Sequence, residues 1–348
     1  MWKENEVFRS DLEALCESSC LPWQELEGKS VFITGGTGLI GYTVTSAVAY
    51  YALTRRKNIR VRLLVRDEAR ARERFAAQFS DGCDIGFVTG TVEDMPAVEE
   101  PIDYIIHGAC PTASRYFVDH PAETAKTIFS GAANILELAR RKQVAGMVFL
   151  SSMEAYGEIR ERRELREEDL GVIDLYSPRS VYPEGKRMAE NLCCAYAAEY
   201  GVPVSVVRLC QTFGPGVKKE DGRVFAYMAR SALAGEDIRL STAGTKENMY
   251  LYTADAAGAI LLLLLRGRRG AAYNAGNPET YCSVKGMGEL VARTLGEGKI
   301  SVRTNTGDAN GIYPPDSFLK LDVSRLCALG WRPATGLEEM FRRMVACF

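Results

Sequence analysis

The chain has 348 residues, 47% of them hydrophobic, which is enough for a large core and one or two domains. Its 43 Lys and Arg against 45 Asp and Glu give a net charge of −2, which argues against a nucleic-acid surface. With two histidines and ten cysteines but no C-x-x-C pair, we expect no bound metal.

No secretory signal is expected, because the first residues are charged. The apolar run at 256–265 is too short to span a bilayer, so we expect no membrane association. Free thiols fit a reducing compartment, and we expect a cytoplasmic protein.

Residues 1–28 precede the first strand, and their apolar spacing predicts an amphipathic helix and a loop packed on the core. Ser30–Ile33 then has the pattern of a short buried strand, and Tyr42–Leu53 has the pattern of a helix. Between them the glycines recur every three residues: Gly35, Gly38 and Gly41. Glycines let the backbone approach a ligand, and free N–H groups at a helix start face an anion, so we expect a dinucleotide diphosphate here.

Further along, strand patterns alternate with helical ones. We expect strands at 59–65, 84–88, 103–107, 146–151 and 203–209, and helices at 67–79, 121–142 and 182–200. This alternation predicts an α/β fold, a Rossmann-type doubly wound parallel sheet. Ligands bind such sheets at the carboxyl ends of the strands, so functional residues should follow Ile33, Val65, His107, Leu150 and Leu209.

From about Gln211 the chain changes to a long polar loop and short elements. We interpret this part as a smaller C-terminal substrate-binding lobe, interleaved with the sheet. The expected division is an N-terminal extension, 1–28; a dinucleotide-binding domain, 29–210, to which 249–275 returns; and the lobe, 211–248 and 276–348.

Two motifs suggest catalysis. S-S-M-E-A-Y-G, 151–157, follows a strand, and Y-P-E-G-K, 182–186, opens a helix and places Tyr182 and Lys186 on one helix face. A phenol with a pKa of about 10 is a poor base at neutral pH. The Lys186 ammonium and a cationic nicotinamide should therefore lower the pKa of Tyr182, while Ser152 hydrogen-bonds the substrate oxygen.

In these motifs the chain resembles the extended short-chain dehydrogenases/reductases, the NAD-dependent epimerase/dehydratase family. The matching segments are T-G-G-T-G-L-I-G at 34–41, the two motifs above, F-G-P-G at 213–216 and L-G-W at 329–331. The resemblance implies catalysis by Ser152, Tyr182 and Lys186 and a nucleotide-sugar substrate. We expect cofactor contacts from Gly35, Gly38, Leu39, Ile40, Gly41, Arg66, Ala109, Tyr182 and Lys186, and substrate contacts from Pro111, Ser152, Arg179, Gln211, Lys218 and Arg223.

Within the family, the segments at 107–114, 177–187 and 221–224 look most like those of UDP-glucuronate decarboxylases. Glu154 agrees, because decarboxylases and 4,6-dehydratases carry a glutamate there for the proton at sugar carbon 5. The preceding Met153 stands where dehydratases carry an aspartate. The alternatives are a 4-epimerase, a 4,6-dehydratase, and an NADPH-dependent carbonyl reductase of a non-nucleotide substrate. Asn248 favours the reductase, because relatives carry a diphosphate-binding arginine at that position.

The cofactor and the oligomeric state complete the expectations. After the second strand, Arg66 would suit the 2′-phosphate of NADP and Asp67 the ribose diol of NAD. We expect NAD, because redox-neutral members of the family usually retain it, and leave NADP open. Family members pair two helices across a two-fold axis, so we expect a homodimer through the apolar stripes of 121–142 and 182–200: Ile128, Ile135, Leu136, Leu138, Leu192, Ala195 and Tyr196.

Overall fold

The computed structural model describes residues 2, 5–112, 114–304 and 317–348. Seven parallel strands form the main sheet in the spatial order β11-β7-β5-β4-β1-β2-β3. Their bounds are β1 Ser30–Thr34, β2 Arg60–Val65, β3 Ile85–Thr89, β4 Tyr104–His107, β5 Gly146–Ser152, β7 Val204–Leu209 and β11 Ala272–Ala275. The order reverses between β1 and β4, which creates the crevice where doubly wound sheets bind ligands.

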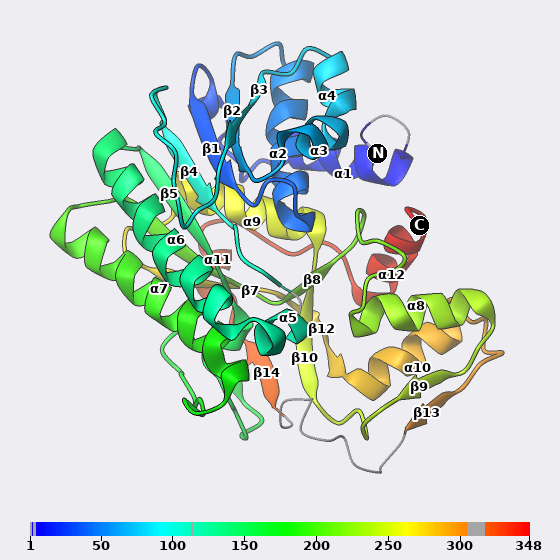
Figure 1. Cartoon of the computed structure of the whole chain (residues 1–348). Coiled ribbons are helices and arrows are strands. Elements are labelled where there is room, and N and C mark those ends of the chain that lie inside the picture. The colour runs from blue at the N-terminus through cyan, green and yellow to red at the C-terminus, as the bar shows by residue number, and fades with distance from the viewer. Residues whose placement is uncertain (1, 3–4, 113, 305–316) are drawn as a thin grey trace.

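Two hydrophobic cores lie on opposite faces of this sheet, because successive side chains of a strand point to opposite sides. Val31 and Ile33 of β1 belong to one core, and Phe32 between them belongs to the other. Figure 1 shows α6 (Pro121–Lys142) and α7 (Val181–Glu199) side by side against one face, whereas α2 (Leu39–Thr54) and α9 (Thr253–Arg266) contact the other. The sheet is therefore covered on both sides, as the alternating sequence pattern predicts.

The smaller lobe contains a second sheet in the order β12-β10-β14-β6, with β8 also paired to β10, and a separate pair, β9 and β13. The strands are β6 Glu164–Leu165, β8 Gln211–Phe213, β9 Ile238–Leu240, β10 Glu247–Tyr252, β12 Asn277–Ser283, β13 Val302–Thr304 and β14 Phe318–Leu321. Its helices are α8 Val224–Ala234, α10 Val284–Thr294, α11 Ser324–Cys327 and α12 Leu337–Val345. Because β11 and α9 pack with the main sheet, the two parts are interleaved; the exact division at 29–210, 249–275 and the rest stays a proposal.

The remaining helices flank these sheets. They are α1 Glu6–Glu17, η1 Trp23–Leu26, α3 Glu68–Arg74, α4 Ala76–Ser80, α5 Ser114–Asp119, η2 Met153–Tyr156 and η3 Pro178–Ser180. Helix α1 packs on α2 and α9, and the two chain ends lie near each other, with Asn5 Nδ2 3.3 Å from the Ala346 carbonyl oxygen (Figure 1). No helix among the described residues is long and apolar enough to cross a membrane.

Two expectations from the sequence need correction. The helix predicted at 67–79 is two helices, because the chain leaves the helical conformation at Phe75, whose ring is buried between Tyr42 and Phe87. The apolar stripe of α6 does not face outward: its four predicted members are buried inside the chain (Ile128, Ile135, Leu136 and Leu138). They pack α6 against α7 and the sheet, so they are not available to a second copy.

Candidate active site

In the turn between β1 and α2, the backbone passes so close to neighbouring main-chain atoms that only glycine fits. Gly35 has φ of 75°, and a Cβ there would lie 2.7 Å from the carbonyl carbon of Gly108, which follows β4. A Cβ on Gly41 would lie 2.2 Å from the Gly35 carbonyl oxygen. The ends of strands β1 and β4 therefore meet at the point where the strand order reverses.

The start of α2 offers free backbone donors to an anion. Gly38 is its N-cap and supplies no side-chain hydrogen bond, and the first intrahelical bond runs from Tyr42 N to Gly38 O at 2.8 Å. The N–H groups of Leu39, Ile40 and Gly41 thus have no intrahelical partner. These donors and the glycine turn fit the diphosphate of a dinucleotide.

Thr34 joins the two strands at this crevice. Its Oγ1 accepts from the backbone N–H of Gly108 at 3.2 Å and of Ala109 at 3.1 Å, and lies 2.7 Å from His107 Nδ1. Burial lowers the pKa of His107 to about 3, so the imidazole is neutral. Because Thr34 Oγ1 already accepts two backbone N–H groups, the tautomer in which His107 Nδ1 accepts the hydroxyl proton completes this network. The sequence analysis missed this role, although Thr34 begins the glycine motif.

Tyr182 is buried at the start of α7, with its ring stacked on Phe117 at a centroid distance of 4.3 Å and an interplanar angle of 10°. Burial raises the pKa of its phenol well above 10, and the charges of Cys110 and Glu154 add to this. A hydrogen bond with Ser152 and the charge of Arg179 act in the opposite direction. The described side chains together thus raise the pKa of Tyr182, and the expected lowering, which relies on the cationic nicotinamide as well as on Lys186, stays a prediction.

The Lys186 ammonium lies beside Tyr182 but donates its hydrogen bond to the backbone of β5. Nζ donates to the Leu150 carbonyl oxygen at 2.7 Å and lies 5.7 Å from the centre of the Tyr182 ring. Its proximity to the Phe149 ring, 4.8 Å away, adds a cation–π contact. Lys186 thus ties α7 to the end of β5, where Ser152 lies, and the phenolate needs further positive charge to form.

Glu154 is held at the same site. Ser152 Oγ accepts the Glu154 backbone N–H at 3.2 Å, which starts η2 directly after β5. Arg179 Nη2 donates to Glu154 Oε2 at 2.7 Å, and the two side chains are 22% and 30% exposed. The guanidinium also lies 5.2 Å from the centre of the Phe117 ring, on which Tyr182 stacks. Glu154 is therefore paired beside the phenol and does not extend into solvent.

Arg187, which the sequence analysis did not single out, fixes the loop that carries Glu154. Its guanidinium donates to three carbonyl oxygens: Ala155 at 2.6 Å, Tyr156 at 3.0 Å and Gly171 at 2.7 Å. Arg187 is next to Lys186 on α7, so the loop after β5 and the helix of Tyr182 are locked together. The adjacency to Lys186 was the only signal, because the acceptors are backbone atoms.

A buried ion pair lies beneath this loop, and it was also missed. Arg208 of β7 makes a two-pronged contact with Glu190 of α7, with Nη2 2.7 Å from Oε2, and Ser151 donates to the same carboxylate. The Arg208 guanidinium lies 4.8 Å from the centre of the Tyr156 ring. Strands β5 and β7 are thereby fastened to α7, the helix that begins with the predicted Tyr182 and Lys186.

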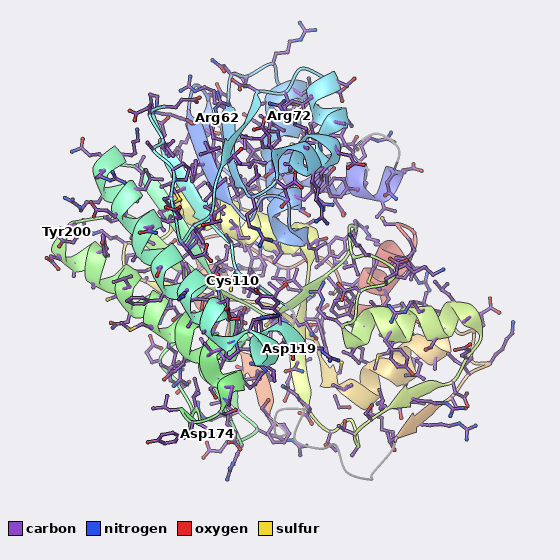
Figure 2. All side chains as sticks on the ribbon, viewed as in Figure 1. Arg62, Arg72, Cys110, Asp119, Asp174 and Tyr200 are labelled. Atoms are coloured by element: carbon purple, nitrogen blue, oxygen red, sulfur yellow. The ribbon has the colours of Figure 1, made fainter. Side chains whose placement is uncertain are left out.

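The other predicted cofactor contacts follow β2 and β4, the strands on either side of β1. Arg66 follows β2 and is exposed, and Asp67 caps α3 by accepting the Arg70 N–H at 3.0 Å. Ala109 follows β4 beside the glycine turn. Figure 2 shows Cys110, the next residue, near the centre of the molecule.

The predicted substrate contacts are more scattered. Pro111 is half-buried after β4, and Gln211 opens β8, paired with Tyr250 of β10. Lys218 is exposed, and Arg223 is engaged by Asp221, with Nη2 2.7 Å from Oδ2. Among the residues that the structure describes, no contact brings Lys218 or Arg223 to Tyr182, so their roles stay predictions.

Asn248 of β10 lies where the resemblance expects an arginine. The residue is buried, and its Oδ1 has no hydrogen-bond partner among the residues described. A buried amide of this length does not supply the cation that a diphosphate requires.

Comparison with known proteins agrees with this geometry. Residues 31–276 match the model of the NAD dependent epimerase/dehydratase family. UDP-glucuronic acid decarboxylase 1 of Xenopus tropicalis is 29% identical over 327 residues, 93% of this chain and 73% of that protein. UDP-glucuronic acid decarboxylase 6 of Arabidopsis thaliana is 31% identical over 239 residues, 68% of this chain and 67% of that protein.

Among solved structures, the UDP-glucose 4-epimerase of Thermotoga maritima superposes with a TM-score of 0.75 at 23% identity, covering 92% of this chain and 98% of that one. That likeness concerns the fold. The sequence matches, the glycine turn at the switch point of the sheet and the Ser152–Tyr182–Lys186 cluster lead to one conclusion: the chain belongs to the NAD-dependent epimerase/dehydratase family and is an NAD-dependent enzyme of that type.

Proposed function

We propose that the protein is a nucleotide-sugar decarboxylase that converts UDP-glucuronate to a UDP-pentose through transient oxidation at sugar carbon 4. Several relatives are named UDP-glucuronic acid decarboxylases, and the resemblance at 107–114, 177–187 and 221–224 supports the same activity. The observation that carries the proposal is the position of Glu154 beside Ser152 and Tyr182.

The proposed catalytic groups are Ser152, Tyr182 and Lys186. Ser152 hydrogen-bonds the oxygen on carbon 4, and Tyr182 takes the proton of that hydroxyl and later returns it. Lys186 positions Tyr182 through its bond to the Leu150 carbonyl. Bound at the glycine turn through Gly35, Gly38, Leu39, Ile40 and Gly41, NAD supplies the hydride acceptor and, with its cationic ring, positive charge that favours the phenolate.

Glu154 is the residue from which we propose that the site decarboxylates its substrate. Oxidation at carbon 4 makes a hexuronic acid a β-keto acid, which loses carbon dioxide readily. The carbon 5 left behind then needs a proton from a positioned acid, and Glu154 is the acidic side chain of this loop that lies beside Tyr182. Met153 has no proton to give to a leaving hydroxyl, which favours decarboxylation over 4,6-dehydration.

We also propose that the enzyme is a cytoplasmic homodimer. All ten cysteines are free thiols, which supports a reducing compartment. The outer faces of α6 and α7 present Phe129, 43% exposed, and Met188, 48% exposed, as apolar contacts for the second copy. Light scattering at micromolar concentration should give twice the chain mass; a monomer would contradict the pairing.

The test is to incubate the purified enzyme with UDP-glucuronate, UDP-glucose and other nucleotide sugars and to follow the product mass. The proposal expects UDP-glucuronate to lose one carbon dioxide without consumption of added cofactor. An unchanged mass with inverted carbon 4 would indicate an epimerase, and loss of one water a dehydratase. A gain of two hydrogens with matching NADPH oxidation would indicate the reductase.

A further inference from the structure

The ion pair between Glu154 and Arg179 conflicts with the task given to Glu154. An ion pair holds Glu154 as a carboxylate, yet protonation of carbon 5 requires the carboxylic acid. The pair is well formed, with Nη2 2.7 Å from Oε2, and both side chains are mostly covered by protein. Something must therefore separate the two groups during the reaction.

Arg179 is placed to accept a second anion. Its guanidinium has five N–H donors, and its one hydrogen bond to the described residues is the bond to Glu154. The guanidinium carbon lies 5.2 Å from the centre of the Phe117 ring, a cation–π distance that places the group beside Tyr182. A planar guanidinium binds a carboxylate through two parallel N–H bonds.

We propose that the carboxylate of the substrate displaces Glu154 from Arg179, and that Glu154 then takes a proton and becomes the acid for carbon 5. This inference rests on the proposed function, because it assigns the substrate class of the same site, a sugar carboxylate. Arg179 is thereby the residue that selects a hexuronic acid over a neutral hexose.

This exchange replaces the positive charge beside Glu154 with a negative one. The groups that face it are Arg179 from η3, Tyr182 from α7 and Cys110 after β4, and Lys186 of α7 also lies near Cys110. Once the substrate occupies Arg179, Glu154 faces a second carboxylate in place of its cation. Like charges in a covered site disfavour two ionised carboxylates, so Glu154 takes a proton from solvent.

The step is balanced. The bond from carbon 5 to the carboxylate carbon breaks, carbon dioxide leaves, and the electron pair remains on the enolate of the 4-keto sugar. The O–H proton of Glu154 goes to carbon 5, and the carboxylate left on Glu154 pairs with Arg179 again. One solvent proton is taken up and one carbon dioxide is released per turnover, and the hydride removed from carbon 4 returns to it.

Binding measurements test the selection of the carboxylate. Calorimetric titrations would use the NAD-loaded Tyr182→Phe enzyme, which we expect to bind substrate without turning it over, with UDP-glucuronate and with UDP-glucose. Adding Arg179→Gln should weaken UDP-glucuronate binding at least about tenfold and change UDP-glucose binding less than about threefold. Arg115→Gln is the control, because this nearby α5 arginine is 92% exposed and pairs with Asp119.

Proton uptake tests the exchange of partners. Titrations at pH 7 in two buffers of different ionisation enthalpy should show nearly one proton taken up per site with UDP-glucuronate and none with UDP-glucose. Adding Glu154→Gln should abolish the uptake while UDP-glucuronate still binds. No uptake by the enzyme that retains Glu154, or equal losses for both sugars in Arg179→Gln, would overturn the inference.

These outcomes are separate from the test of the proposed function. If the unmodified enzyme forms no decarboxylated product, the proposed function fails, whether or not the site prefers a carboxylate. If the product forms but binding shows neither carboxylate preference nor proton uptake, the function stands and the partner exchange is wrong.

Discussion

The glycine turn after β1 and the charged cluster beside Tyr182 lie at the same edge of the main sheet, but they are built differently. The turn is backbone: Gly35 and Gly41 are required because a Cβ would strike neighbouring main-chain atoms. The cluster depends on side chains from separate segments, where Arg179, Glu154 and Phe117 meet around Tyr182. We propose that the first region binds NAD and that the second determines which substrate is converted.

The largest expected effect is on turnover in the cluster. Tyr182→Phe removes the phenol hydroxyl and keeps the ring stacked on Phe117. We expect turnover to fall by at least about 10³-fold with NAD affinity and melting temperature unchanged, because only the proton carrier is lost. Steady-state kinetics, calorimetry and thermal melting check this; near-normal turnover would remove Tyr182 from the mechanism.

The matching change in the backbone region should affect the cofactor. Gly41→Ala places a Cβ 2.2 Å from the Gly35 carbonyl oxygen, so the turn must move. We expect NAD affinity to fall about 10²-fold, measured by titration of cofactor-depleted protein. Gly222→Ala is the control, since nothing lies within 4 Å of a Cβ there. Unchanged NAD affinity would show that the turn does not bind the diphosphate.

A third prediction concerns the pH dependence of stability. It rests on Asp11, which links the N-terminal helix to the lobe. Asp11 of α1 accepts from the Tyr252 hydroxyl at 2.6 Å and from Arg343 at 2.8 Å, and burial raises its pKa to about 6. Folded Asp11 therefore binds a proton more tightly than unfolded Asp11. Its contribution to stability is fully present below about pH 4 and is lost as the pH rises through about 6.

Asp11→Asn should reduce the gain in unfolding free energy between pH 7.5 and pH 5 by about 1.4 kcal/mol, because this interval covers about one pH unit below the folded pKa. Urea denaturation at the two pH values measures it. Asp119→Asn on the exposed end of α5 is the control. Identical pH dependence in Asp11→Asn and the unmodified protein would contradict the buried role of Asp11.

The smallest effect is expected at Arg66. This side chain is exposed after β2, so Arg66→Ala should change NAD affinity less than about threefold. Titration with NAD and NADP decides between the cofactors. NADP binding more than about tenfold tighter than NAD, about 1.4 kcal/mol, and lost in Arg66→Ala, would reverse the choice of NAD.

The contrast between the backbone turn and the side-chain cluster also explains which features the sequence predicts well. The main strands, the helix at 121–142 and the glycine turn follow from local patterns: runs of buried residues, Pro121 at a helix start, and glycines at fixed spacing. Local rules also bring Tyr182 and Lys186 to one helix face.

Contacts between distant segments could not be read in this way. Lys186 donates to the Leu150 carbonyl, Arg187 binds the Gly171 carbonyl, and both acceptors are backbone atoms without a residue-type signature. The burial that raises the pKa of Tyr182 likewise arises from Phe117, 65 residues away, and from the packing of α7. The partners of Arg179 and Asp11 depend on the tertiary fold alone.

The most direct test of the account is the origin of the hydrogen at carbon 5. In deuterated water, the pentose product of UDP-glucuronate should carry one deuterium at carbon 5, detected by NMR. Glu154→Gln should lower turnover by about 10²–10⁴-fold without changing NAD binding or melting temperature. A product without deuterium at carbon 5, or a Glu154→Gln enzyme with normal turnover, would contradict the claim that Glu154 protonates this carbon.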